Sequence, residues 1–197
     1  MPMNADLAQY DADWTARSSP LIADARTDAT RLSGHTANLP HRRGRTAVRL
    51  SRRFDWSAES IFAAWVDPAI VGRWLFATAV RPMASTAIDA RAGGSFRLSE
   101  QRGERTVEHR GFYADFVPPH RLAFTLTTPD HPVDTRIDVD IASRPRGCVL
   151  KLLHANVIPG HATRIRQRWI GMLYGLDATL RAGVSSRATP TAQEPVR

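Results

Sequence analysis

Two segments, more than thirty residues apart, constrain the fold of this chain most. Residues 110–127, RGFYADFVPPHRLAFTLT, have the pattern of two strands joined by a Pro-Pro turn. Residues 160–182 have the pattern of one long helix, because their apolar side chains recur at spacings of three and four. A helix with a broad apolar stripe needs a surface to cover, and strands with one apolar face supply it. Together the segments predict a sheet that wraps around one long helix.

Short alternating segments separated by turn residues predict the rest of the sheet. A first strand begins near Thr46, where TAVRLSRRF alternates Val48 and Leu50 with polar residues. Further strands are expected at 77–81, 86–90, 95–100, 106–117, 121–128, 134–143 and 148–154. Strands this close together, joined by tight glycine turns, predict an antiparallel meander with one buried face and one wet face. On that reading Asp138 and Asp140 are solvated.

Two short helices are expected after the first strand. Asp55 or Ser57 caps the first, and Asp67-Pro68 ends it because proline cannot continue a helix interior. The second spans 69–76. Their apolar faces consist of Ile61, Phe62, Trp65 and Val66, then Ile70, Trp74 and Leu75. In the long helix, Gly171 and Gly175 lie four apart and are expected to form a notch for a strand or a ligand.

The domain organisation follows from composition. One domain is expected at 46–182, between a polar extension at 1–45 and a polar tail at 183–197, both expected to be disordered and dispensable for folding. No apolar run reaches the length of a membrane span, and no secretory leader is visible at the N-terminus. The single cysteine, Cys148, is expected to be a small core residue in a reducing compartment. These features predict a cytoplasmic protein with no membrane partner.

The charge of the chain does not indicate a nucleic-acid partner. The net charge is +8, but Lys151 is the only lysine, and an arginine bias of this kind is not a basic patch. The clusters at 41–45 (HRRGR), Arg52-Arg53 and 164–168 are not interleaved with aromatic residues as a base-stacking platform would be. Arg97, Arg110 and Arg136 alternate with apolar neighbours and are expected on the outer face of the sheet. A bulge at Arg110 would instead turn it toward an anionic ligand.

The chain resembles the activator of heat-shock protein 90 ATPase homologues (C-terminal-domain-like), within the SRPBCC or START-like helix-grip superfamily. The segments that carry the resemblance are FDWSAESIFAAWVDPAIVGRW, ARAGGSFRL, RGFYADFVPPHRLAFT, CVLKLLH and RWIGMLYGLDATL, in this order. The resemblance implies an α+β helix-grip fold, in which a curved antiparallel sheet grips a long C-terminal helix. It also implies a link to the stress response and a contact with a chaperone or a second copy of the chain. Members bind lipids, hormones or polyketides, or act as cyclases, so the fold does not define the task.

A helix-grip body commonly holds a cavity between sheet and helix. The residues expected to line it are Trp65, Trp74, Phe96, Leu98, His109, Tyr113, Phe124, Leu126, His154, Trp169, Met172, Leu173 and Leu176. His109, Tyr113 and His154 are its polar candidates, as hydrogen-bonding or acid–base groups. The alternative is that the histidines are core residues satisfied by backbone carbonyls and that the aromatic rings fill the core.

No motif of a known catalytic class is visible. The chain has no GxSxG, HExxH, CxxC or glycine-rich phosphate loop, and its histidines lack metal-ligand spacing. We therefore expect no metal and no cofactor. The leading hypothesis is a non-enzymatic protein that binds a small hydrophobic molecule. The alternatives are a cyclase, dehydratase or hydrolase that uses His109, Tyr113 or His154, and a co-chaperone-like interaction module.

Overall fold

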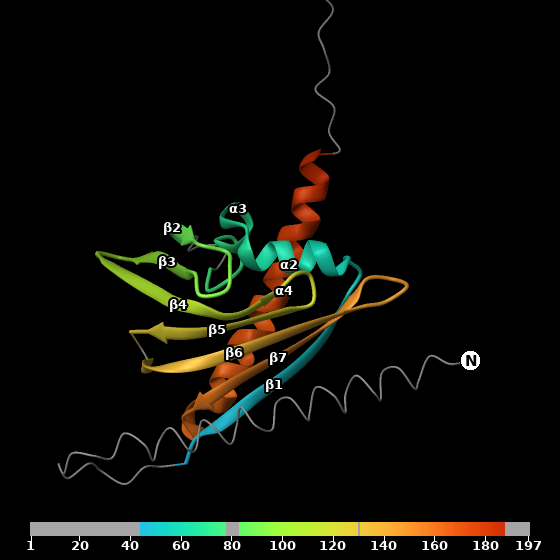
Figure 1. Ribbon diagram of the computed structural model, residues 1–197. Coiled ribbons are helices and arrows are strands. Elements are labelled where there is room, and N and C mark those ends of the chain that lie inside the picture. Colours follow the sequence, from blue (N-terminus) through green and yellow to red (C-terminus); the bar gives the residue numbers. More distant parts are fainter. Residues whose placement is uncertain (1–43, 78–82, 130, 188–197) are drawn as a thin grey trace, which may run out of the picture.

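The computed structural model describes residues 44–77, 83–129 and 131–187, which form a curved sheet packed against one long helix (Figure 1). The strands are β1 (Thr46–Phe54), β2 (Met83–Ile88), β3 (Ser95–Arg102), β4 (Arg105–Val117), β5 (Arg121–Thr128), β6 (His131–Ser143) and β7 (Cys148–Val157). The helices are α2 (Ala58–Val66), α3 (Pro68–Val71), the 3-10 turn η1 (Pro159–His161) and α4 (Ala162–Arg187). All strand pairs are antiparallel, in the order β1-β7-β6-β5-β4-β3-β2. The predicted helix-grip fold is confirmed.

The two short helices are fixed by side-chain caps. Ser57 caps α2, with its hydroxyl accepting from the Ser60 amide at 3.2 Å. Asp67 ends α2 and caps α3, with its carboxylate accepting from the Ala69 amide at 2.8 Å. Both are residue types that accept well at a helix N-terminus. The chain therefore turns sharply between the helices and places both at one end of the sheet.

Several element bounds differ from the prediction. The second helix ends at Val71 instead of 76, because the chain turns at 72–74 and the Trp74 indole donates back to the Ala64 carbonyl at 2.9 Å. The strand expected at 86–90 is β2, at 83–88, since the hairpin bond from the Asp89 amide to the Ser95 carbonyl follows it. The strand expected at 77–81 lies outside the described residues except for Ala77, which is not in a strand. Helix α4 continues to Arg187, because no proline interrupts it before Pro190.

The core lies between the inner face of the sheet and the helices. Its centre is aromatic: the ring centroids of Trp65 lie 4.7 Å from Trp74 and 6.1 Å from both Trp169 and Phe124. Cys148 is buried in this core, as predicted. Asp177 anchors α4 to the turn after β1 by accepting from the Trp56 indole at 2.8 Å. Helix and sheet are therefore held together by dense packing and by specific polar contacts.

The prediction that the acids of β6 are solvated is wrong. Asp138 and Asp140 are both buried on the outer face, the face turned away from α4. The Arg121 guanidinium contacts the Asp138 carboxylate at 2.9 Å and the Asp140 carboxylate at 3.0 Å. The same guanidinium contacts Asp115 at 2.6 Å, and Arg136 contacts Asp138 at 3.0 Å. Arginine can contact several carboxylates at once, and this pairing permits the burial of the acids.

The two glycines of α4 do not form the predicted notch. A Cβ atom added at Gly171 would meet no atom of the described residues within 4 Å, because this residue lies on the exposed side of the helix. A Cβ atom at Gly175 would lie 3.7 Å from the Cβ of Trp74, an ordinary van der Waals distance. Gly171 thus lies at the exposed surface and Gly175 contacts Trp74, so the two glycines do not form one notch.

Candidate functional site

Two small cavities lie between the sheet and the helices. The tyrosine cavity encloses about 10 Å³ and is lined by Trp65, Val71, Leu75, Ile88, Phe96, Leu98, Tyr113, Leu122 and Phe124. The histidine cavity encloses about 40 Å³ and is lined by Phe76, His109, Leu126, Thr128, Thr135, His154, Ile165, Arg168, Trp169 and Met172. One water molecule needs roughly 10–15 Å³ measured this way. The interface between sheet and helix is therefore mostly filled by side chains.

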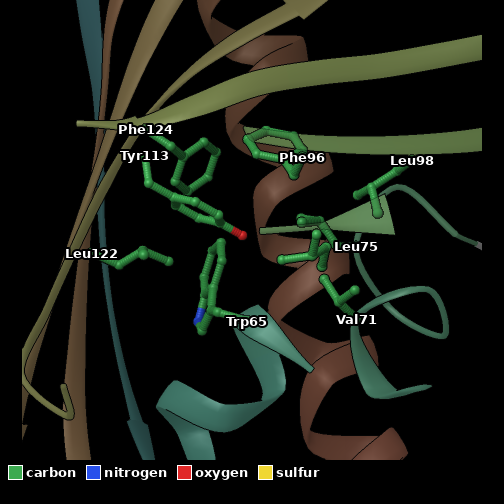
Figure 2. A pocket seen from close by; sticks show the side chains of 9 residues that line it. Trp65, Val71, Leu75, Phe96, Leu98, Tyr113, Leu122 and Phe124 are labelled. Carbon is green, nitrogen blue, oxygen red and sulfur yellow. The ribbon is translucent and has the colours of Figure 1, made fainter. Parts of the chain in front are cut away.

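The tyrosine cavity is almost entirely apolar. Figure 2 shows the Tyr113 hydroxyl pointing into the space between Trp65, Phe96 and Leu75. Burial raises the pKa of Tyr113 well above its ordinary value, so the hydroxyl stays protonated. This cavity has room for about one water molecule, which would lie beside the Tyr113 hydroxyl.

The histidine cavity gathers side chains from four strands and from α4. His109 comes from β4, Leu126 from β5, Thr135 from β6 and His154 from β7. They share a face because alternate residues of each strand point the same way. Helix α4 contributes Ile165, Arg168, Trp169 and Met172, one or more from each successive turn. Since Arg168 is exposed, the cavity reaches the surface beside it.

His154 is tied to the long helix. Its Nδ1 atom accepts a hydrogen bond of 2.9 Å from the indole of Trp169. Indole nitrogen can only donate, so Nδ1 carries no proton and the neutral ring holds its proton at Nε2. This bond therefore joins the histidine to a tryptophan side chain of α4, where a backbone carbonyl was the expected partner of a core histidine.

His109 is the least satisfied polar side chain in the cavity. It is 2 % exposed, and no described residue forms a hydrogen bond with either ring nitrogen. The ring stacks on Phe76, with centroids 4.2 Å apart. Its Nε2 atom lies 3.7 Å from a carboxylate oxygen of Glu100, beyond hydrogen-bond distance.

Electrostatics around His109 favour its neutral form. Burial lowers the pKa of His109, and this effect outweighs the Glu100 carboxylate, which acts in the opposite direction. The positive charges of Arg168 and Arg102 lower it further. Arg102 also forms an ion pair with Glu100. At neutral pH the cavity therefore presents an uncharged imidazole, able to donate from one nitrogen and accept at the other.

The sequence pattern did not assign Glu100, Arg102, Phe76 or Arg168 to the cavity. The strand pattern could have found Glu100, since alternation from Phe96 and Leu98 places its carboxylate on the inner face beside His109. Phe76 could not be found, because its position depends on a left-handed backbone with φ of 60°. The Phe76 amide donates to the Met172 sulfur at 3.3 Å, which fixes this turn against α4.

The predicted site residues do not form one cavity. Trp65, Phe96, Leu98, Tyr113 and Phe124 line the tyrosine cavity, whereas His109, Leu126, His154, Trp169 and Met172 line the histidine cavity. The other three, Trp74, Leu173 and Leu176, are buried in the core and line neither of the two. Arg97 and Arg110 are exposed on the outer face, as expected. The described residues contain no group of three or more acidic, cysteine or histidine side chains that could hold a metal ion.

Comparison with known proteins identifies relatives of the whole domain. Residues 55–181 match the family model described as activator of Hsp90 ATPase homolog 1-like protein. No curated protein matches the chain. Within the part of the chain that the structure describes, no helix is both long enough and apolar enough to cross a membrane.

Solved structures with the same fold share little sequence with this chain. The solution structure of an AHSA1-like protein from Aeromonas hydrophila has a TM-score of 0.62 at 20% identity, covering 74% of this chain and 99% of that one. A crystal structure from Rhodobacter sphaeroides has a TM-score of 0.61 at 24% identity, covering 70% and 93%. A protein of unknown function from Staphylococcus aureus has a TM-score of 0.65 at 14% identity, covering 72% and 96%. At these identities the likeness shows the fold alone.

Proposed function

This chain belongs to the family of activator of Hsp90 ATPase homolog 1-like proteins, and from that premise we propose that it binds a small apolar molecule with one hydrogen-bonding group. The proposed site is the histidine cavity. The observation that carries the proposal is His109, a buried imidazole without a hydrogen-bond partner among the described residues. A buried polar group left without a partner costs roughly 1–3 kcal/mol, which a ligand that hydrogen-bonds to it would recover.

The size of the cavity limits the ligand. Pockets for drug-sized molecules measure roughly 300–1,000 Å³, and this cavity encloses about 40 Å³. A ligand larger than a few atoms must displace side chains at the rim. Met172 is the side chain most suited to move, because it is unbranched and half-buried beside exposed Arg168. An acidic ligand would place its carboxylate near Arg168 and its apolar part against Trp169 and Leu126.

A thermal-shift screen tests the proposal. The panel contains short and medium-chain fatty acids, monocyclic phenols, flavonoids, sterols and aromatic polyketides. A ligand at a hundredfold excess over its Kd stabilises the native state by roughly 2.7 kcal/mol. We expect at least one clear rise in Tm, reduced in His109→Phe and retained in Tyr113→Phe, the matched control that removes the polar group of the tyrosine cavity.

Two results would count against binding in this cavity. One is a Tm unchanged by every compound. The other is a rise in Tm that survives His109→Phe unaltered. In the first case the interaction module becomes the better account, with exposed Phe112 and the neighbouring cross-strand pair Arg97 and Arg110 as its surface for a chaperone or a second copy.

A second candidate function is acid–base catalysis in the same cavity. The observation that favours it is Glu100, whose carboxylate lies 3.7 Å from His109 and could orient or polarise this ring once a substrate closes the gap. The two candidates differ in their response to Glu100→Gln. Both keep the Tm shift that reports binding, but only an enzyme has a turnover, and Glu100→Gln should abolish it. The compartment we propose is the cytoplasm, which suits a single buried cysteine without a disulfide partner.

A further inference from the structure

The two ends of the histidine cavity differ in charge and in access to water. Its inner end holds the buried imidazole of His109, and its outer end holds the exposed guanidinium of Arg168. Between them the walls are mostly apolar, with buried Leu126 on the sheet and buried Trp169 on α4. A ligand that fills the cavity therefore meets a neutral polar group at one end and a cation at the other.

The inner end offers a hydrogen-bond acceptor. The Nε2 atom of His109 lies 3.7 Å from a carboxylate oxygen of Glu100, and a carboxylate favours the N–H side of a neutral imidazole. The ring proton therefore resides at Nε2, which leaves Nδ1 as an acceptor without a donor among the described residues. A ligand hydroxyl can donate to this atom. A ligand carboxylate at this end would instead be repelled by the charge of Glu100.

The outer end offers a cation that no described residue neutralises. Arg168 forms no ion pair or hydrogen bond with any described residue, whereas Arg102, near the inner end, is paired with Glu100. The charge of Arg168 reaches into the cavity, because it contributes to the lowered pKa of His109. A guanidinium group binds a carboxylate through two parallel hydrogen bonds. The mouth of the cavity is therefore suited to the carboxylate of a ligand.

We infer that the ligand is a small hydroxy acid, with its carboxylate on Arg168, its hydroxyl donating to His109 and its apolar body between sheet and helix. The inference rests on the proposed function, since it takes the histidine cavity as the binding site. A carboxylate fits better than a phosphate, because Arg168 is the only cation among the described residues that line the cavity. Helix α4 begins at Ala162, more than one turn earlier, so no helix N-terminus adds a second anion-binding group.

Three probes of nearly the same shape test the two ends of the ligand separately. The first, para-hydroxyphenylacetate, carries both polar groups. Phenylacetate lacks the hydroxyl, and para-hydroxyphenylacetamide lacks the charge. NMR titration of the full chain gives the Kd of each, also for weak binding. We expect the first probe to bind most tightly, with Kd raised roughly threefold to tenfold by loss of the charge and roughly twofold to tenfold by loss of the hydroxyl.

Matched substitutions assign each end of the probe to a residue. Arg168→Gln should abolish the preference for the acid over its amide. Arg164→Gln is the control, because it removes an exposed cation one turn away that does not line the cavity, and it should keep this preference. His109→Phe should abolish the preference for para-hydroxyphenylacetate over phenylacetate. Added salt should weaken only the preference for the acid, since it screens exposed charges.

The comparison of acid and amide in the unmodified chain decides the inference without any variant. The inference fails if the amide binds as tightly as the acid, or if Arg168→Gln leaves the preference for the acid unchanged. It also fails if none of the three probes binds. The proposed function is judged separately: it stands if a neutral compound binds the wild type and this binding is lost in His109→Phe, and it falls only if the whole thermal-shift panel gives no such compound.

Discussion

At the scale of single residues, His109 is an ionisable side chain that is deeply buried. Burial lowers its pKa, so below about pH 6.5 the unfolded chain binds a proton that the folded chain does not. The neutral folded ring therefore contributes stability that is present at neutral pH and lost as pH falls toward the folded pKa. We predict that Tm falls between pH 7.5 and 5.5, and that it falls less in His109→Phe. Differential scanning calorimetry across this range checks the prediction.

The groups that face His109 supply a second test. Glu100, Arg102 and Arg168 lie around the ring and set its local field. Arg168→Gln removes one of the cations that lower the pKa of His109, so its Tm should fall less than that of the wild type between pH 7.5 and 5.5. Parallel profiles for wild type and His109→Phe would show that His109 is not the titrating group.

Trp169 is the residue that most directly couples α4 to the sheet. It is fully buried, its ring contacts that of Trp65 at a tilt of 34°, and its indole donates to His154. Trp169→Ala should lower the free energy of unfolding by about 3–5 kcal/mol, the range for a large aromatic truncated in a core. Trp169→Phe keeps most of the ring and loses the donor, so it should cost roughly 1–3 kcal/mol. Urea denaturation measures both, and a near-wild-type midpoint for Trp169→Ala would contradict this packing.

Among the elements, α4 carries a glycine that serves no packing purpose. Gly171 lies on the exposed side, with open space where a Cβ atom would stand. Gly171→Ala should therefore stabilise the protein by about 0.5–1 kcal/mol, since alanine loses less backbone entropy in a helix interior. Chemical denaturation of the variant measures this gain.

Gly111 in β4 is the contrasting control. A Cβ atom there would meet the backbone oxygen of Thr125 and lie 2.8 Å from the Phe96 ring. Gly111→Ala should destabilise the protein, because the strands at that point have no room to separate without loss of pairing. If both alanine substitutions shifted the free energy of unfolding in the same direction, the packing described at Gly171 or at Gly111 would be wrong.

Periodicity predicts elements well and their ends poorly. The apolar stripe of α4 and the alternation in β5, β6 and β7 were readable, because both depend on local spacing. The end of α3 was not, because a long-range contact fixes it: Trp74 turns back to the Ala64 carbonyl and so leaves the helix early. The acids of β6 were misread for a related reason, as alternation gives the face of Asp138 but not its ion pair with Arg121.

For the molecule as a whole, the last turns of α4 should contribute little to stability. Val184 in these turns is exposed, so a chain that ends at residue 182 should unfold within about 1 kcal/mol of the full chain. Urea denaturation of the truncated and full chains measures this, and a much lower midpoint for the truncated chain would contradict it.

The fold of the whole domain was predictable, whereas the site was predictable only in part. The order of strands and helices along the chain indicated the helix-grip architecture. The two small cavities in place of one could not be anticipated, since they depend on how Trp65, Trp74 and Phe124 pack in three dimensions. The expected set mixed the linings of the two cavities with Trp74, Leu173 and Leu176, which pack in the core and line neither.

The first strand pairs with the last, so β1 cannot form its hydrogen bonds until nearly the whole domain has been synthesised. Arg45 and its partner Asn156 are 111 residues apart in the chain. A ribosome that adds about 5–20 residues per second needs roughly 5–20 seconds to bridge that interval. During synthesis β1 therefore emerges with its hydrogen-bonding edge open and has no partner until β7 leaves the exit tunnel. The nascent chain therefore contains an unpaired β1 for more than half of its translation.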